Sequence, residues 1–428
     1  GEFLWEFHPI PRDASSPVAD NWPANAWASA GGANAWAPLS VDEKRGLVFI
    51  PTGSASPDYF GGLRPGDNRY ANSVVALEAA TGEVVWHFQL VHHDLWDYDT
   101  PAQPLLVDVM HEGQLTAAVI QVTKQGLVFV LDRDTGEPLI PVEERPVSQN
   151  AVAGEWVSPT QPFPLWPAPL VDTDISGADA FGFTPWDRGA CAKRIDGLNH
   201  EGLFTPITEQ KTLMLPGSLG GANWGGAVFW QDEQLLVVNV NTAPFEGQLI
   251  PQGVGAAGDH VVGHGREMRV TMQDTPYVMS VDSLLSPLGV PCTPPLGVPC
   301  TPPPWGKLVA IDMSTGELRW QSALGSVHEM GPLPLPFEIN WGTPNLGGAM
   351  MTAGGLVFIG ATMDRRLRAF DTKTGEVLWR ATLPVDATAS PMTYEIEGRQ
   401  YVVIAAGGHH MFQRGSGDYL IAYALDSE

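Results

Sequence analysis

The sequence predicts an all-β protein with the architecture of a β-propeller, and this prediction depends on three observations. The first is a hairpin pattern that occurs at "ALEAATGEVVW" (76–86), "VLDRDTGEPLI" (130–140), "AIDMSTGELRW" (310–320) and "AFDTKTGEVLW" (369–379). The second is a set of further β-like runs between these copies, such as "GLVFIPTG" (46–53) and "GLVFIGAT" (355–362). The third is that apolar residues almost nowhere recur with the spacing of a helix.

Each copy of the pattern is typical of two strands joined by a tight turn. An apolar strand end precedes Thr-Gly-Glu and a second apolar strand follows it, and the glycine suits the positive φ of such a turn. The glycines are 54 residues apart from Gly82 to Gly136 and 59 apart from Gly316 to Gly375, which suits four strands and a long loop. The 180 residues from Gly136 to Gly316 would hold about two further blades and loops rich in Pro and Trp.

The tryptophans of the pattern, Trp5, Trp86, Trp320 and Trp379, are expected to pack between blades without a functional role. The opening "GEFLW" (1–5) matches the second half of the pattern, with Gly1 at the position of the turn glycine. We therefore expect the chain to begin inside a hairpin, as part of a longer protein, and residues 1–428 to form one propeller domain.

Composition excludes several classes of function. The 428 residues are 44% hydrophobic, which is enough for a substantial core, and the formal net charge of −25 argues against nucleic acid or an anionic membrane surface as a partner. No run of about 18 apolar residues is present, so no membrane-spanning helix is predicted. The chain has no Cys-x-x-Cys-His, so it carries no covalent c-type haem.

Three cysteines, Cys191, Cys292 and Cys300, are too few for a disulfide framework. Two of them lie in an exact tandem octamer, "PLGVPCTP" at 287–294 and 295–302. Its proline content and lack of periodicity predict a loop. A neutral duplication in a tolerant loop and a duplicated binding element are both open interpretations.

The stretch "HHDLWDYDTPAQP" (92–104) crowds carboxylates beside aromatic rings. Between Trp96 and Tyr98, Asp97 would lose solvation, which raises a carboxyl pKa and suits a general base that abstracts an alcohol proton. A buried structural ion network is the alternative. Lys124 is a lone cation in an apolar strand, so it needs a carboxylate, as in an internal salt bridge, or an anionic ligand.

Several longer segments together resemble one family along the whole chain. They are "ANAWAP" (33–38), "SPDYFGG" (56–62), "RYANSVVALEAATG" (69–82), "HHDLWDYDTPAQP" (92–104), "SPTQPF" (158–163), "EGLFTPITEQKTLMLPGSLGGANWGG" (201–226), "PMTYEIEGRQYVVIAAGGHH" (391–410) and "GDYLIAYAL" (417–425). They are similar to the membrane-bound glucose/quinate/shikimate dehydrogenases that depend on pyrroloquinoline quinone (PQQ). The resemblance implies an eight-bladed propeller behind membrane helices. This chain would be its C-terminal portion, with about six blades and without the membrane segment.

The resemblance also implies roles for individual residues. Asp97 matches the proposed general base, and Lys124 matches the lysine at the quinone of the cofactor. The planar cofactor would stack on Trp36, which could otherwise be a core residue. The other cofactor-binding candidates are Asn239 (with Asn241 as an alternative alignment), Trp224 and His409, the last of which would lie near the substrate entrance or in a simple loop.

Two departures from the alcohol-dehydrogenase branch favour an aldose or cyclic polyol as substrate. That branch has an adjacent Cys-Cys pair and a Thr-Gly-Asn metal ligand, whereas this chain has no such pair and has Ser54 in "TGS". The ligands of the expected divalent cation, Ca²⁺ or Mg²⁺, are therefore largely unidentified. Asp99 could supply one oxygen, or it could cap a hairpin.

The function implied is oxidation of a glucose-, quinate- or shikimate-like alcohol, with electrons passed to ubiquinone at the periplasmic face of the bacterial inner membrane. Asp97 would take the hydroxyl proton as a hydride equivalent moves to the cofactor, with the cation and Lys124 stabilising the negative charge that develops. Membrane contact would come only through an N-terminal part. The alternatives are a PQQ-dependent alcohol dehydrogenase and a non-catalytic propeller scaffold. Trp36, Asp97 and Lys124 should converge on one central funnel, although without further blades the cofactor would bind weakly or not at all.

Overall fold

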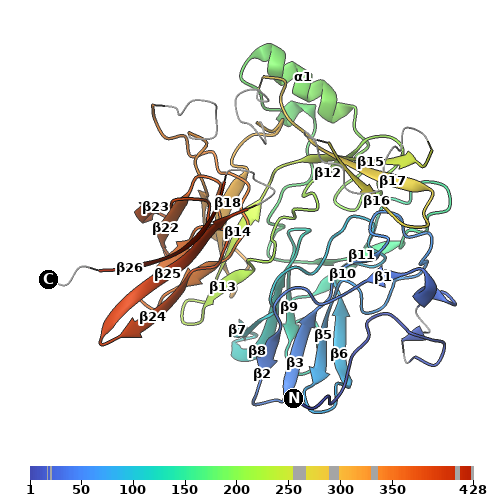
Figure 1. The fold of residues 1–428 in the computed structure, drawn as a ribbon, viewed down its shortest axis with the longest axis horizontal. Helices are drawn as coiled ribbons and strands as arrows, with labels where there is room; N and C mark the ends of the chain where they lie inside the picture. The colour runs from blue at the N-terminus through green and yellow to red at the C-terminus, as the bar shows by residue number, and fades with distance from the viewer. Residues whose placement is uncertain are drawn as a thin grey trace.

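A computed structural model describes residues 1–16, 18–19, 22–253, 267–288, 298–328, 336–409 and 415–425 of the chain. Antiparallel sheets dominate these residues, which confirms the all-β prediction (Figure 1). Most of the tandem octamer, with Cys292, lies outside them.

Two sheets come from the first third of the chain, at the lower right of Figure 1. The first contains β2 (Ser40–Asp42), β3 (Leu47–Pro51), β5 (Ser73–Glu78) and β6 (Val84–Gln89) in that order. The second contains β7 (Leu105–His111), β8 (Gln114–Val122) and β9 (Val128–Asp132). They pack face to face through a core that includes Phe49, Trp86 and Phe129.

Three further sheets continue this series, at the left of Figure 1. The first contains β13 (Ala227–Trp230), β14 (Leu235–Asn241), β18 (Gly306–Asp312) and β19 (Leu318–Ala323), and the next β20 (Ala349–Met351), β21 (Leu356–Ile359), β22 (Arg366–Asp371) and β23 (Val377–Thr382). The last contains β24 (Met392–Ile396), β25 (Arg399–Gly408) and β26 (Ser416–Ala424). Separate apolar clusters join each of these sheets to its neighbour.

A sixth sheet departs from the series. It contains β12 (Thr212–Met214), β15 (Phe245–Pro251), β17 (Tyr277–Ser283) and β16 (Glu267–Thr271), and most of it is inserted between β14 and β18. Its apolar side chains pack on the loop that carries Trp96 and Tyr98. The predicted number of about six blades is therefore not confirmed by these sheets, of which only five pack in sequence.

The remaining elements are short. They are β1 (Gly31–Gly32) paired with β4 (Ala55–Ser56), β10 (Val142–Pro146) paired with β11 (Thr160–Pro164), the 3₁₀ helices η2 (Ala26–Ala28) and η3 (Gly177–Asp179), and the helix α1 (Pro185–Asp196). The helix was not expected, although Thr184 caps it and Pro185 occupies its first position, both ordinary helix-start signals. No helix in the described ranges is long and apolar enough to cross a membrane.

The Thr-Gly-Glu turns form as predicted, with one exception. Gly82, Gly136, Gly316 and Gly375 all have positive φ. In the copy at 130–140, however, the second strand is reduced to an isolated bridge between Leu131 and Pro138. Proline has no N–H with which to extend a ladder, and this explains the difference.

The tryptophans pack between sheets as predicted. A Cβ built on Gly82 would lie 2.5 Å from the ring of Trp5, and one on Gly136 would lie 2.5 Å from the ring of Trp86. Trp320 covers Gly375 in the same way, and the unforeseen Trp166 covers Gly316. Trp379 instead contacts Tyr423 in the last sheet, with ring centroids 5.2 Å apart.

The packing of Trp86 on Gly136 gives a direct stability prediction. Gly136→Ala should destabilise the fold by two costs, a side chain at positive φ and a clash with Trp86. Gly113→Ala is the matched control, because Gly113 also has positive φ but nothing lies within 4 Å of its Cβ position. Chemical denaturation should show a loss of about 1 kcal/mol for Gly113→Ala and roughly 1–3 kcal/mol more for Gly136→Ala. Equal losses would contradict the packing role.

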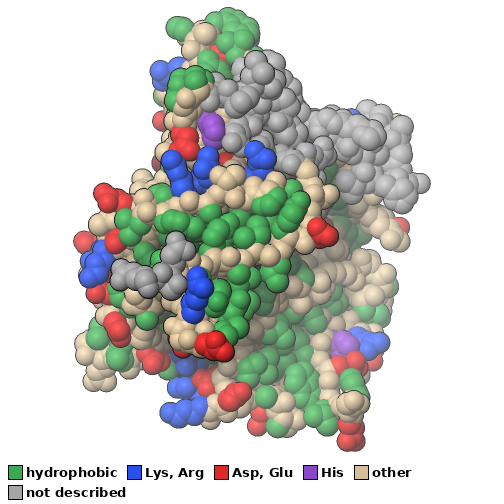
Figure 2. Space-filling view, turned by 60° about the vertical axis from the view of Figure 1, so that its left-hand side comes forward, with side chains coloured by type: hydrophobic (Ala, Val, Ile, Leu, Met, Phe, Trp, Pro, Cys, Tyr) green, Lys and Arg blue, Asp and Glu red, His purple; other side chains and the backbone are tan. Residues whose placement is uncertain are grey.

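The last sheet exposes apolar side chains. Met392, Ile396, Tyr419 and Leu420 are 46–76% exposed. Figure 2, which brings this side of the molecule forward, shows hydrophobic side chains spread across it. Residues 1–8, by contrast, form no strand, and the predicted first half-hairpin is seen only in the packing of Trp5 on Gly82.

Candidate functional site

The loop between β6 and β7 is organised by a carboxylate that the sequence did not single out. The buried side chain of Asp94 accepts hydrogen bonds from the backbone N–H of Trp96 (3.0 Å) and of Tyr98 (2.8 Å). It also accepts from the Ser54 hydroxyl and from the Asn72 amide, the latter at 3.1 Å. A short-range Asx turn of this kind is the signal that could have identified Asp94 from sequence.

The two aromatic residues of the loop anchor it against the inserted sheet. The indole N–H of Trp96 donates to the carbonyl of Thr205 (2.7 Å), and the Tyr98 hydroxyl donates to the carbonyl of Pro216 (2.9 Å). Their rings stack at 5.9 Å, and Phe204 packs edge-on against both. Asp97, between them, adopts φ +58°, which turns it away from this buried side of the loop.

Lys124 joins both carboxylates on the other side of the loop. Its ammonium donates to Asp99 Oδ2 at 2.8 Å, to the backbone carbonyl of Asp97 at 2.8 Å and to Asp97 Oδ2 at 3.3 Å. The side chain of Lys124 is 6% exposed and that of Asp99 13%, whereas Asp97 keeps 25% of its surface exposed. Asp97 is therefore the member of this triad that an incoming molecule can touch.

Burial and charge separate the two carboxylates. Burial raises the pKa of Asp97 well above its ordinary value, Lys124 offsets part of this shift, and the neighbouring Asp99, Asp58 and Asp94 add to it. Burial also raises the pKa of Asp99, but the charge and hydrogen bond of Lys124 outweigh it and hold that pKa below its ordinary value. The charged pair is thus Lys124 with Asp99, and Asp97 is the group suited to exchange a proton.

Trp36 lies beside the same triad. A Cβ on Gly53 would lie 2.5 Å from Asp99 Oδ1 and 3.3 Å from Trp36 Nε1. The Trp36 indole and the Asp99 carboxylate therefore both lie close to the backbone of this glycine. Ser54, next in sequence, donates its N–H to Asp99 Oδ1 at 2.7 Å. Trp36 is 44% exposed, which rules out the alternative that it is a core residue.

The asparagine candidates connect to Lys124 through the backbone. Gly221 donates to the Lys124 carbonyl (2.6 Å) and accepts from the Asn241 N–H (2.8 Å). The side chain of Asn239 is buried and donates to Asn345 Oδ1 at 2.6 Å, and that of Asn241 donates to the Asn345 carbonyl at 3.0 Å. Asn345, which no sequence pattern indicated, therefore fixes both candidates.

The last two predicted residues are placed differently. Trp224 is half-buried and packs in an apolar cluster with Leu219, on the segment that also presses Gly220 against the Lys124 side chain. His409 directly follows β25 and is partly exposed. Its role near the substrate entrance stays a prediction.

A divalent cation does not fit the side chains as they stand. No group of three or more His, Cys, Asp or Glu side chains within the described ranges is arranged to hold a metal ion. Both oxygens of Asp99 already accept hydrogen bonds, from Ser54 and from the Lys124 ammonium, which would repel a cation. We derive no chemical step through a metal ion.

Asp99→Asn distinguishes the two roles considered for Asp99. If Asp99 positions Lys124, the variant should lose at least tenfold in turnover, and raising Ca²⁺ or Mg²⁺ should not restore it. If Asp99 is a metal ligand, a higher cation concentration should restore turnover, because a weakened site fills at higher concentration. Turnover measured over a Ca²⁺ and Mg²⁺ titration gives the answer.

Comparison with known proteins shows which proteins this chain is similar to. The family model described as "Glucose/ethanol/alcohol dehydrogenase, beta-propeller domain" matches residues 1–402. The chain is 41% identical to a quinoprotein glucose dehydrogenase of Escherichia coli (strain K12), over 100% of this chain and 53% of that protein. It is 39% identical to a quinate/shikimate dehydrogenase (quinone) of Acinetobacter baylyi, over 92% of this chain and 49% of that protein.

A solved structure agrees in fold. The quinohemoprotein alcohol dehydrogenase from Comamonas testosteroni superposes with a TM-score of 0.63 at 22% identity, covering 98% of this chain and 54% of that one. The chain spans about half the length of the curated relatives it matches.

Proposed function

The chain belongs to the glucose/ethanol/alcohol dehydrogenase β-propeller family, and we propose that it is the catalytic part of a PQQ-dependent dehydrogenase that oxidises an aldose or cyclic polyol. The observation that carries this proposal is the triad of Lys124, Asp97 and Asp99 beside the exposed ring of Trp36. A buried ammonium beside two carboxylates and an open aromatic face suits a planar, anionic quinone better than it suits a structural scaffold.

The residues present fit such a cofactor. Trp36 would support its ring, and Lys124, the buried charged donor of the triad, would hold a carbonyl or carboxylate oxygen. Asn239 and Trp224 lie on segments that contact Lys124 or its neighbours and would border the same space. When bound, PQQ supplies a quinone that accepts two electrons from the substrate.

Asp97 carries the proton chemistry of this proposal. Its 25% exposed carboxylate accepts the hydroxyl proton of the substrate, and Lys124 offsets part of the rise in its pKa and orients it through the bonds to its side chain and backbone. Tyr59, whose hydroxyl lies 3.5 Å from Asp97 Oδ2, supports the same carboxylate. The wall of Trp96, Tyr98 and Phe204 keeps water from the back of the loop.

The substrate class rests on sequence departures and on the names of the relatives. Ser54 stands where the alcohol branch has an asparagine, and it donates hydrogen bonds to Asp94 and Asp99. The chain has no adjacent cysteines. Both features accord with relatives named for glucose and for quinate or shikimate rather than for simple alcohols.

The same proposal includes the electron acceptor, which would be ubiquinone. It also includes the location, which would be the periplasmic face of the inner membrane, reached through an N-terminal membrane part. The disulfide between Cys191 and Cys300 supports an oxidising compartment, because such bonds persist outside the reducing cytosol.

The test uses the complete protein reconstituted with PQQ and with either Ca²⁺ or Mg²⁺. Glucose, quinate, shikimate and ethanol are screened with an artificial electron acceptor, and protein without PQQ is the control. We expect oxidation of at least one ring polyol at a kcat/KM well above that for ethanol. A faster rate with ethanol would support the alcohol-dehydrogenase alternative, and no PQQ-dependent rate with any substrate would refute the proposal.

A further inference from the structure

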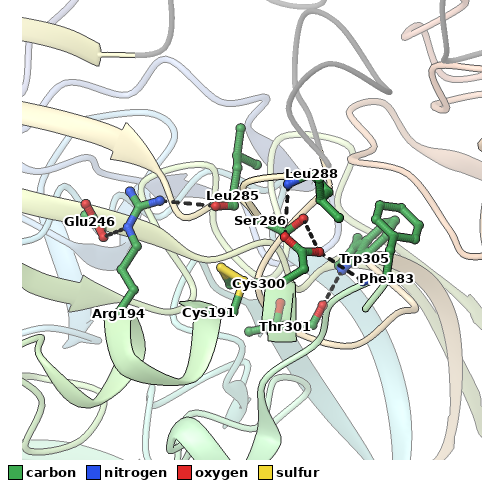
Figure 3. Close-up of a disulfide and its surroundings, with 11 residues drawn as sticks. Phe183, Cys191, Arg194, Glu246, Leu285, Ser286, Leu288, Cys300, Thr301 and Trp305 are labelled. Atoms are coloured by element: carbon green, nitrogen blue, oxygen red, sulfur yellow. Dashed lines mark hydrogen bonds and ion pairs between the residues drawn. A yellow bond between two sulfur atoms is a disulfide. The ribbon is translucent and has the colours of Figure 1, made fainter. Parts of the chain in front are cut away.

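The disulfide-bonded helix α1 is an unexpected support in the upper part of the molecule (Figure 1). Of its residues only Asp187, Cys191 and Ile195 are buried, so apolar packing holds it weakly. The bond from Cys191 to Cys300 ties it to the segment that leads into β18 (Figure 3). The triad of Lys124, Asp97 and Asp99 does not explain why α1 is bonded to the rest of the fold.

The buried carboxylate of Asp187 fastens the same region. It accepts hydrogen bonds from the backbone N–H of Phe183 (2.9 Å) and of Leu288 (2.9 Å) and from the Ser286 hydroxyl (3.0 Å). Figure 3 shows Phe183, Ser286 and Leu288 near the disulfide. Asp187 and the disulfide therefore fix the chain at Phe183 and on its C-terminal side.

What they fix is a cluster of four aromatic rings, Phe181, Phe183, Trp305 and Trp341. Phe181 donates its N–H to the Cys300 carbonyl at 2.7 Å. Its ring centroid lies 6.0 Å from Trp305 and 5.6 Å from Trp341, and Phe183 lies 6.3 Å from Trp341. Trp305 is buried, whereas Phe181 and Trp341 are half-buried and Phe183 is 45% exposed.

The aromatic cluster is continuous with the candidate site. The Trp305 carbonyl accepts from the N–H of Thr242, the residue after Asn241, at 3.1 Å. Leu346, the residue after Asn345, packs in the same apolar cluster, and so do Leu219 and Trp224 from the segment beside Lys124. Trp341 therefore shares an apolar cluster with Trp224, a residue proposed to hold the cofactor, and Phe183 joins this cluster through its ring contact with Trp341.

We propose that Phe183 and Trp341 form a subsite for the apolar C–H face of the polyol ring, and that the Cys191–Cys300 disulfide positions it. This inference rests on the proposed function. Aromatic faces suit such a ring because they offer rigid apolar area, while polar groups nearby fix its orientation. A subsite that includes Phe183, just before a weakly packed helix, needs a covalent tie to hold its geometry, since small displacements are costly at a binding site.

The experiment compares variants of the complete, PQQ-loaded protein with the ring polyol that it oxidises. Phe183→Ala should raise KM about tenfold with kcat within twofold, because a binding contact is removed and the proton chemistry is not. The Cys191→Ser/Cys300→Ser double variant should raise KM in the same direction and make residues 181–197 exchange their amide hydrogens faster. Trp186→Ala, 65% exposed on the same helix, is the matched control and should change neither quantity.

A second measurement separates this inference from the proposed function. Polyol binding is titrated by tryptophan fluorescence in protein without PQQ, where no turnover occurs, and Phe183→Ala should weaken it about tenfold. An active enzyme in which Phe183→Ala leaves both KM and this affinity unchanged would overturn the subsite. Non-reducing peptide mapping should find Cys191 joined to Cys300, and a bond to Cys292 of the other octamer would overturn the positioning role.

Discussion

Replacing Asp97 by asparagine is expected to lower kcat/KM for the oxidised polyol by about 10²–10⁴-fold, the usual contribution of a general base. Asparagine keeps the shape of the side chain but cannot accept the proton. The Trp36 face and the Lys124–Asp99 pair remain, so PQQ should still bind. Turnover and PQQ affinity of the complete protein are measured side by side, with Asp108→Asn, an exposed aspartate of β7, as the control.

The pH dependence gives the same prediction a second readout. Asp97 is the base only when deprotonated, and burial raises its pKa well above the ordinary value. The wild-type kcat/KM should therefore fall as the pH drops through this raised pKa and level off above it, and Asp97→Asn should lack this limb. A variant with unimpaired kcat/KM but lowered stability would instead support the structural ion network.

Replacing Lys124 by methionine should have the largest effect on stability. Asp97 and Asp99 would lose the ammonium that compensates them in a mostly buried site, and breaking such a pair costs about 3–5 kcal/mol. PQQ affinity should fall too, since the charged donor is lost. Lys124→Arg should not restore function fully, because the guanidinium is larger and has a fixed geometry.

A double-mutant cycle tests the reason for this loss. If the cost arises from the uncompensated carboxylate of Asp99, then Lys124→Met/Asp99→Asn should be more stable than Lys124→Met alone. Urea denaturation of the four proteins gives the coupling free energy. Additive losses would show that Lys124 and Asp99 do not depend on each other.

The sequence predicted those parts of the molecule that depend on local patterns. Repeated Thr-Gly-Glu turns predicted the hairpins, and the tryptophan at a fixed offset predicted the packing between sheets, because each contact repeats the same short-range geometry. The missing second strand at Pro138 also has a local cause in the sequence, because proline cannot extend a ladder. The sequence also singled out Asp97, Lys124 and Trp36, which the fold brings close together, while their roles stay predictions.

The features that were missed depend on contacts between distant residues. The inserted sheet combines β12 with β15, β16 and β17, although β13 and β14 of another sheet lie between them in the sequence. Its packing on Trp96 and Tyr98 is a contact between distant residues. Asn345 reaches Asn239 across more than 100 residues, and Cys191 reaches Cys300 across 109. A single sequence does not specify which of two identical octamers supplies the cysteine.

A density map of the complete protein with bound PQQ tests most directly whether Trp36, Asp97 and Lys124 form a single PQQ site. We expect planar density against the Trp36 ring, with an oxygen in hydrogen-bond contact with Lys124 and the Asp97 carboxylate facing the remaining open space. Density for PQQ at a place that touches neither Trp36 nor Lys124 would contradict it.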